Sequence, residues 1–472
     1  MPRPTDTLPR IAVVGHTNVG KTSLMRTLMR DPRFGEVAPT AATTRQVESA
    51  RLLVDGRAVV ELFDTPGLED AGALLEHLEG LDSPRHDGPA RLRDFLDSDP
   101  ARGRFEQEAR VLEQMLDCDA ALYVIDAREP VLGKYQDELA VLTMAARPLL
   151  PVLNFTGSGQ PLVEHWRDAL ARVGLHAVVE FDSVIYSRQA EARMWQRLAV
   201  LLESWAEPLE ALVRDRELLA GRLHRAGLRL AAHLVIEAAA ARRHAPGNDP
   251  AQAAGMLEAL KKAVTQRERG FIRQALELYR FEESEVELLA LPIAPDGWRQ
   301  SLFEPGALER FGKRTGTGAA AGAGAGAAVD LATGGLSLGA GTIVGLLVGS
   351  GGSAAWQLRH ALADRLRGRI SILLDNAALS HLAARAVALV EALDQRGHAA
   401  QQAIRAGDAP PAPWPSKRMP EPVLRARNHP GISTLNVGTP NLALADQLVE
   451  QLAMELERSA DQSSSLTKLS IM

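Results

Sequence analysis

The chain has 472 residues, a net charge of −6 and 46% hydrophobic residues, enough for two to four domains with buried cores. It has no strongly basic field, so we predict no nucleic-acid partner. The single cysteine, Cys118, excludes an internal disulfide, and Met1 to Arg10 contain no apolar signal segment. We therefore expect a cytoplasmic location.

The most informative stretch is Gly15 to Thr22, which has the spacing G-x-x-x-x-G-K-[ST]. It lies between residues 11–14, a predicted buried strand, and residues 23–30, a predicted helix. Glycines let backbone N–H groups surround a phosphate, and the following helix directs its positive end at it. Lys21 is placed to reach the β- and γ-phosphates of a nucleotide, and the Thr22 hydroxyl to bind Mg²⁺. The predicted nucleotide-binding residues of this loop are Gly15, Asn18, Val19, Gly20, Lys21, Thr22 and Ser23.

Two strands follow, at 47–54 and 58–63, with Asp55-Gly56 between them as a favoured hairpin turn. The second strand leads into Asp64-Thr65-Pro66-Gly67. This D-x-x-G pattern at the carboxyl end of a strand places Asp64 to hold a Mg²⁺-bound water. It also places the Gly67 N–H to meet a γ-phosphate.

Three more strands are predicted at 120–125, 149–155 and 177–181, separated by helices at about 133–147 and 160–173. The fold class is therefore α/β: a mostly parallel sheet with one antiparallel edge strand and helices on both faces. An enlarged insertion at about 68–118 contains further helical segments, at 71–81, 90–96 and 105–116. Its prolines separate them.

Residues 10 to about 205 resemble a translation-factor-class GTPase of the Era/TrmE branch. The phosphate loop, Thr43-Thr44-Arg45, Asp64-Thr65-Pro66-Gly67 and the sequence V-I-D-A-R-E at 124–129 match that branch in order and spacing. The whole chain also resembles bacterial Era-like GTPases that carry an uncharacterised helical carboxyl-terminal region.

The resemblance implies hydrolysis of GTP to GDP and phosphate by positioning and electrostatics. The residues it makes catalytic are Lys21, Thr44, Asp64 and Gly67. The Mg²⁺ ligands it implies are Thr22 and Thr44, with Thr43 the less favoured alternative, and Asp64 through a water.

Two residues depart from or refine this scheme. Leu68 stands where Ras-like enzymes have a glutamine that orients the attacking water, which suggests slow intrinsic hydrolysis or a different catalytic device. Asn18 occupies the position at which TrmE-like and dynamin-like enzymes help to bind K⁺, so we hypothesise K⁺-stimulated turnover. The alternative is that Asn18 only tolerates the backbone conformation of the loop.

The family reads guanine with N-K-x-D, and this chain has Asn154-Phe155-Thr156-Gly157 at that place. Asn154 is retained and Phe155 could stack on the base, so both are predicted nucleotide contacts. The aspartate that accepts from guanine is absent, which puts the base specificity in doubt. Asp182 is a candidate substitute, and the alternative is a turn or helix-capping residue.

Residues 206–312 form a predicted long-helix region. Its apolar residues recur at helical spacing over about 191–243 and 251–281, with a kink or restart at Pro208. An antiparallel helical hairpin is expected. It is either a plain bundle or a stalk that transmits the nucleotide state or forms a homodimer.

Residues 313–358 are rich in glycine and alanine, and 315–329 and 331–358 are uncharged. The glycines recur every four residues, as in closely packed membrane helices. The segment either contacts a membrane surface, which would place the protein at the inner face of the membrane, or is a soluble hairpin or linker. The remaining part, 359–472, is predicted to contain helices at 359–393 and 441–458, a proline-rich linker at 409–422 and a polar tail.

The sequence thus favours a GTP-hydrolysing conformational switch with Mg²⁺ and a candidate K⁺ ion as cofactors. The alternatives are a nucleotide-binding scaffold with little turnover or relaxed base specificity, and a dynamin-like GTPase that remodels membranes.

Overall fold

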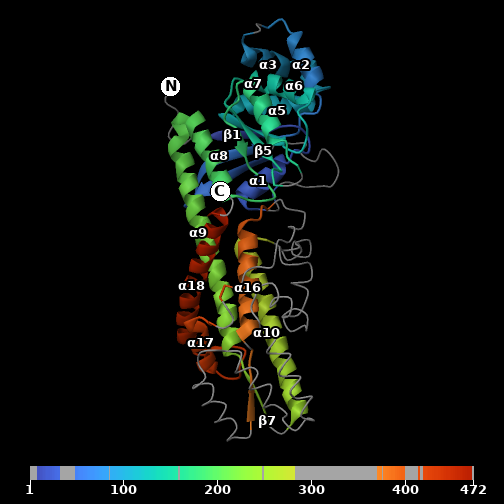
Figure 1. The fold of residues 1–472 in the computed structure, drawn as a ribbon. Coiled ribbons are helices and arrows are strands. Elements are labelled where there is room, and N and C mark those ends of the chain that lie inside the picture. Colours follow the sequence, from blue (N-terminus) through green and yellow to red (C-terminus); the bar gives the residue numbers. More distant parts are fainter. Residues whose placement is uncertain are drawn as a thin grey trace. The chain divides into compact units, whose positions relative to one another are not determined.

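The computed structural model describes residues 8–31, 34, 48–83, 86–157, 160–246, 249–281, 369–374, 376–398, 413–414 and 418–469 (Figure 1). The chain divides into two compact units. The first comprises Met1–Gly221 and Gln395–Gln401, and the second comprises Arg222–Asp394 and Gln402–Met472. The division falls beyond residue 205, where the sequence analysis placed the domain boundary.

A six-stranded sheet forms the centre of the first unit, in the order β2-β3-β1-β4-β5-β6. Strand β2 pairs antiparallel with β3 at one edge, and all other neighbours are parallel. This mixed sheet confirms the predicted fold class. The strands are β1 (Arg10–Val14), β2 (Glu48–Val54), β3 (Arg57–Asp64), β4 (Ala120–Asp126), β5 (Leu149–Asn154) and β6 (Val179–Glu180).

The burial of the central strands explains their composition. All seven residues of β4 are buried, as expected of a parallel strand covered on both faces. In β1, Ile11 and Val13 belong to one apolar core and Ala12 and Val14 to the other. At the sheet edge, the β2–β3 hairpin turns through Asp55 and Gly56, both with positive φ, as the Asp-Gly pair predicts.

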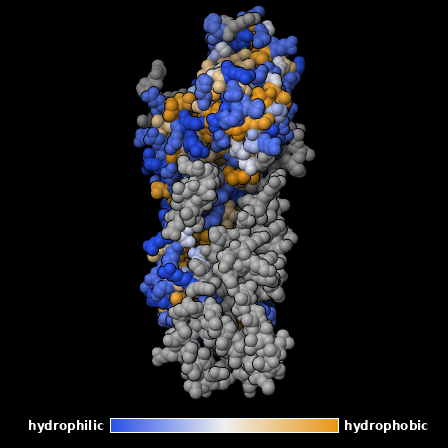
Figure 2. All heavy atoms as spheres, viewed as in Figure 1, coloured by the Kyte–Doolittle hydropathy of each residue, from blue (hydrophilic) through white to orange (hydrophobic). Residues whose placement is uncertain are grey.

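Helices cover both faces of the sheet. Helices α1 and α8 contribute to the core on one face, whereas α2, α3, α5, α6 and α7 contribute to the other. On the visible face of this unit, hydrophilic residues are interspersed with hydrophobic ones (Figure 2). The helices are α1 (Lys21–Met29), α2 (Ala71–Glu79), α3 (Gly88–Leu96), α4 (Asp99–Arg102), α5 (Glu106–Asp117), α6 (Gly133–Thr143), α7 (Val163–Arg172) and α8 (Arg188–Leu201).

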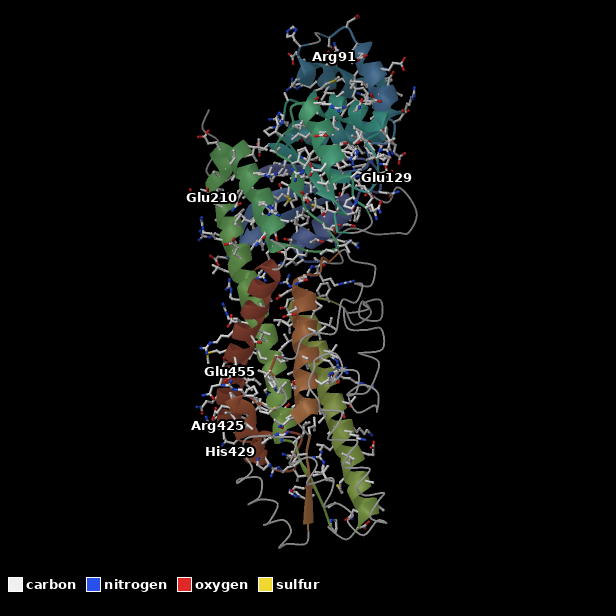
Figure 3. The ribbon with its side chains drawn as sticks, viewed as in Figure 1. Arg91, Glu129, Glu210, Arg425, His429 and Glu455 are labelled. Atoms are coloured by element: carbon white, nitrogen blue, oxygen red, sulfur yellow. The ribbon has the colours of Figure 1, made fainter. Side chains whose placement is uncertain are left out.

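Helices α2 to α5 make up the predicted insertion between β3 and β4. The guanidinium of the buried Arg91, labelled in Figure 3, donates to the carbonyl of Leu78 at 3.1 Å and to that of Ser83. These bonds tie α3 to the end of α2. The insertion is therefore an ordered part of the first unit.

The second unit is built mainly of helices around a core of alanine, leucine and valine. A short 3₁₀ turn, η1 (Glu203–Trp205), precedes α9 (Ala206–Ala240), within which the two units meet in sequence. The strands β7 (Arg243–Pro246) and β8 (Arg369–Ile372) pair antiparallel. The other elements are α10 (Pro250–Tyr279), α16 (Asn376–Asp394), α17 (Glu421–Asn428), the 3₁₀ turn η2 (Pro430–Ile432) and α18 (Leu442–Leu469).

Three sequence-based boundaries in this half are wrong. Residues 369–372 are strand rather than helix, because alternating Ile370 and Ile372 lie in a segment that pairs with the distant β7. Helix α18 continues to Leu469, past residue 458 and into the predicted tail. Helix α17 begins inside the predicted linker, with Pro422 in its first turn, where a missing N–H costs nothing.

Helix α8 ends at Leu201, and α9 begins two residues before Pro208. The helical pattern therefore restarts there, and the proline lies in a first turn that tolerates it.

Some expectations fall on residues outside the described ranges, namely those for Thr43, Thr44 and the segment 313–358. Of the helices that the structure does describe, none has both the length and the apolar character needed to cross a membrane.

Candidate nucleotide-binding site

The loop from Gly15 to Lys21 joins β1 to α1 at the carboxyl end of the strand. Gly15, Asn18 and Gly20 all have positive φ, at 143°, 66° and 91°. A side chain at position 15 would collide with the carbonyl of Val124 in β4. The loop conformation therefore needs its glycines, and Asn18 is a residue type that tolerates the left-handed region.

The amino terminus of α1 follows directly on the phosphate loop. Its N-cap is Gly20, which has no side chain to cap the helix, and its first turn contains Thr22 and Ser23. Lys21 lies in the same turn and its ammonium donates to the loop carbonyls of Gly15 at 3.1 Å and His16 at 2.8 Å. Burial lowers the pKa of Lys21 to about 8, against the opposing effect of Asp64 and other carboxylates. This arrangement suits a phosphate group.

Thr22 and Asp64 form the candidate Mg²⁺ site. The Thr22 hydroxyl donates to Asp64 Oδ2 at 2.6 Å, which joins α1 to the end of β3. Asp64 is only 1% exposed, and among the described residues its Oδ1 atom has no hydrogen-bond partner. Burial raises the pKa of Asp64 to about 6. A hydroxyl and an under-coordinated buried carboxylate are the hard oxygen donors that Mg²⁺ prefers, so these residues fit the ion.

The D-x-x-G segment lies directly against the phosphate loop. A Cβ atom at Gly67 would come within 2.6 Å of the Thr17 Cα, so only glycine fits. The next residue, Leu68, donates its N–H to the Gly15 carbonyl at 3.2 Å and is fully buried in the core. Leu68 thus has a packing role, and its side chain has no polar group to orient a water.

Helix α5 of the insertion holds this segment, which the sequence analysis did not anticipate. The Gln107 amide donates to the Gly67 carbonyl at 3.0 Å. The buried carboxylate of Glu108 accepts from the backbone N–H groups of Glu69 at 3.3 Å and Asp70 at 3.2 Å. No local sequence signal connects residues 67 and 107, because only the tertiary fold brings α5 to this point.

His16 was also missed as a residue of the site. Its Nδ1 atom lies 2.6 Å from Oε1 of Glu138, a fully buried carboxylate on α6. The other oxygen of Glu138 accepts from the Tyr123 hydroxyl at 2.9 Å. This network anchors the phosphate loop to β4 and α6.

Asn154 organises the other end of the candidate site, where the resemblance places the base. This fully buried side chain donates to the Val19 carbonyl at 3.0 Å and accepts from the N–H groups of Phe155 and Ser183, each at 2.9 Å. It therefore links the phosphate loop, the end of β5 and the loop that follows β6. The sequence motifs predict Asn154 and Val19 as separate nucleotide contacts, and the structure brings them together.

Phe155 has a positive φ of 58°, and its ring lies 3.0 Å from the point where a Cβ of Gly20 would be. The guanidinium of Arg128 stacks on the ring, 4.2 Å from its centre, and is held by a bidentate pair with Asp126. Arg128 lies in the turn after β4, next to Glu129, which Figure 3 labels. The Phe155 ring, with the Arg128 guanidinium stacked on it, therefore occupies the position at which the family has the lysine of N-K-x-D.

Asp182 occupies the neighbourhood of the missing aspartate. Its Oδ2 atom accepts from the Gly157 N–H at 2.8 Å and lies 3.3 Å from where a Cβ of residue 157 would be. Its Oδ1 atom accepts from Val184 at 2.8 Å and Ile185 at 3.0 Å. Three backbone bonds commit this carboxylate to closing its turn, which favours the capping interpretation over direct base reading.

Comparison with known proteins identifies both parts of the chain. Residues 10–155 match the family described as 50S ribosome-binding GTPase, and residues 167–454 match a domain of unknown function, DUF3482. The probable GTP-binding protein EngB of Gemmatimonas aurantiaca is 31% identical over 34% of this chain and 80% of that protein. The GTPase Der of Nitrobacter hamburgensis is 31% identical over 33% of each chain.

A crystal structure of Era in complex with MgGDPNP and nucleotides of 16S ribosomal RNA overlaps 41% of this chain and 56% of that one. Its sequence identity is 16% and its TM-score 0.31. In the two sequence comparisons, this chain covers most of the length of EngB but only about a third of the length of Der. The amino-terminal unit is a GTP-binding GTPase domain; the chain belongs to the P-loop GTPases of the translation-factor class, and its larger carboxyl-terminal part belongs to the DUF3482 family.

Proposed function

We propose that this protein is a Mg²⁺-dependent conformational switch that hydrolyses GTP slowly on its own. The observation that carries the proposal is the contact between the D-x-x-G segment and the phosphate loop. Gly67 lies against Thr17, and Leu68 bonds to Gly15. A γ-phosphate that enters the loop must meet this segment, so its arrival and loss can reposition residues 67–70. Helix α5 holds those residues and would be displaced with them.

Slow turnover follows from Leu68. A buried leucine cannot orient the attacking water. The alternative of a scaffold with little turnover rests on the same observation. Multiple-turnover phosphate release separates them: a switch releases phosphate continuously from GTP, whereas a scaffold retains bound GTP over hours.

We propose further that guanine is preferred, with weaker discrimination than N-K-x-D provides. Phe155 supplies stacking, but position 157 is a glycine and offers no carboxylate for the guanine donors. Side-by-side affinities for GTP, ATP and XTP test this. Equal GTP and ATP affinities would remove the guanine assignment and leave the phosphate site intact.

The finer proposal of a K⁺ site at Asn18 is tested by comparing turnover in K⁺ and Na⁺ buffers. The positive φ of Asn18 is equally well explained by the backbone conformation that the loop requires. Equal rates in the two buffers would eliminate the K⁺ role.

The decisive experiment for the function is calorimetric titration of the full chain with Mg·GTP, with Lys21→Ala as the test variant. Removing the ammonium that lies in the phosphate loop should abolish measurable binding. Lys261→Ala serves as a matched control, because this lysine lies on α10 in the second unit and pairs with the exposed Glu258 at 2.7 Å. It should bind GTP within about threefold of the unaltered chain. No binding by the unaltered chain would refute the proposal.

We also propose that the glycine-spaced segment 315–358, uncharged except for Asp330, brings the protein to the inner face of a membrane from the cytoplasm, and that the helical region forms a homodimer. The support is the sequence pattern alone. Fractionation of cell extracts at low and high salt tests the first idea, and light scattering with GTP and GDP tests the second. A dynamin-like activity would require assembly that depends on the nucleotide.

A further inference from the structure

A short segment from the far carboxyl-terminal half is built into the first unit. Gln395 and Gly397 pair with the loop that follows β6: the Tyr186 N–H donates to the Gln395 carbonyl at 2.9 Å, and the Gly397 N–H donates to the Val184 carbonyl at 3.0 Å. Ile185 and Arg396 form an antiparallel bridge between these bonds. Arg396 is 3% exposed and Gly397 is also buried, whereas Gln395 is exposed.

Gly397 makes this close approach possible. A Cβ atom at this position would come within 2.8 Å of the Ser183 carbonyl carbon and closer still to its oxygen. The same oxygen accepts from the buried Thr27 hydroxyl of α1 at 2.8 Å. Ser183 is thus held between α1, which carries the phosphate loop, and the segment 395–397.

The loop that the segment contacts is the base end of the nucleotide site. The Ser183 N–H donates to Asn154, and Asp182 bonds to Gly157 and closes the turn. The positions of Ser183 and Val184 therefore depend on three stretches of chain: residues 154–157, α1 and residues 395–397. The match to the GTPase family ends at 155, whereas the DUF3482 match includes both β6 with its loop and the segment 395–397.

We propose that Gln395–Gly397 is a positioning segment of the nucleotide site, which sets the affinity for the base but not for the phosphates. The proposal rests on the proposed function, because it assumes that a nucleotide base occupies the Asn154 end. The segment follows directly on α16. The last residue of α16, Asp394, accepts from Tyr279 at 2.8 Å and pairs with His224.

Gly397→Ala in the full chain tests the proposal. The added methyl group must push the Ser183 carbonyl away, which displaces the loop at the base end directly, whereas none of its three nearest atoms lies in residues 15–22. We expect the affinity for Mg·GTP to fall about tenfold, comparable to the loss of one or two polar contacts. The affinity for inorganic triphosphate with Mg²⁺, measured by competition, should change less than about twofold.

Gly431→Ala is the matched control, because a Cβ atom at Gly431 meets nothing within 4 Å. It should bind both ligands as the unaltered chain does. Parallel losses for GTP and triphosphate in Gly397→Ala, or unchanged affinity for both, would overturn the proposal. A chain that binds no GTP before any substitution would instead refute the proposed function, so the two failures are distinguishable.

Hydrogen exchange on the unaltered chain keeps the proposal testable if Gly397→Ala does not fold. Binding of Mg·GTP should slow the exchange of the Tyr186 and Gly397 amides, which bridge the two stretches. Inorganic triphosphate should slow exchange in the phosphate loop alone. Protection by GTP that stops at residue 157 would contradict a positioning role for the segment.

Discussion

Asp64→Asn should make the nucleotide-free protein more stable while it removes the response to Mg²⁺. Burial raises the pKa of Asp64 to about 6 from an ordinary value of 3.8. At about 1.4 kcal/mol for each pH unit, keeping this carboxylate ionised costs roughly 3 kcal/mol at neutral pH. Asparagine carries no charge and can still accept from Thr22. Its amide N–H groups would lack an acceptor, which reduces the gain in stability by about 1 kcal/mol. The expected gain is therefore roughly 2 kcal/mol.

The sign of the pH dependence follows from the raised pKa. Between about pH 4 and pH 6 the folded state binds more protons at Asp64 than the unfolded state, so its contribution to stability falls as the pH rises. The advantage of Asp64→Asn should thus appear over this range and stay constant above about pH 7. Urea denaturation followed by tryptophan fluorescence, without nucleotide, measures it.

Asp182→Asn provides the matched control with the opposite sign. This carboxylate accepts three backbone N–H groups, and an amide can accept with only one of its two terminal atoms. Asp182→Asn should therefore cost about 2 kcal/mol. The reasoning on Asp64 is refuted if Asp64→Asn is less stable than the unaltered chain at pH 7.5, or if its advantage persists undiminished at pH 4.

Further expectations concern the same site. Because burial lowers the pKa of Lys21 to about 8, the affinity for GTP should decline above this pH, and binding there should take up protons. Calorimetry in buffers of different ionisation enthalpy detects this. Glu138→Gln leaves one of its two donors poorly paired and should lower stability by about 1–3 kcal/mol, whereas Glu106→Gln at an exposed ion pair should change it by less than ~0.5 kcal/mol. Glu108→Ala removes the acceptor for two backbone groups, so hydrogen exchange at residues 69 and 70 should accelerate at least tenfold. Phe155→Ala should weaken GTP binding by about tenfold through lost stacking, and an unchanged affinity would place the base elsewhere.

The phosphate end of the site was predictable because its chemistry is local. Eight consecutive residues supply the loop, the ammonium and the hydroxyl, and a strand and a helix must flank them. Asp64 and Gly67 were equally visible, since their spacing and their place at the end of a strand carry the information. The parallel part of the sheet was predictable from the alternation of strands and helices. The antiparallel strand β2 was predictable from the Asp-Gly pair, which is typical of a hairpin turn.

The supporting residues could not be predicted, because tertiary contacts alone bring them to the site. Glu138 lies 122 residues from His16, and Gln107 lies 40 residues from Gly67. The pairing of β7 with β8 was missed for the same reason: an alternation of isoleucines over four residues is too short to separate a strand from a helix, and the partner strand is more than a hundred residues away. The sequence alone does not show that a polar side chain on a helix is buried, because its hydrogen-bond partner comes from a distant part of the chain.

The two ends of the nucleotide site therefore have different origins in the chain. The phosphate end lies within one continuous family region, residues 10–155, and contains the groups that any purine triphosphate would meet. The proposed base end combines Asn154 from that region with the loop after β6 and residues 395–397, which belong to the DUF3482 region. Because position 157 is a glycine and not an aspartate, the strongest local determinant of base specificity is missing. The geometry of the loop after β6 then becomes the remaining determinant of that specificity. Base selectivity in this protein should thus respond to substitutions in its carboxyl-terminal half, whereas the chemistry at the phosphates should not.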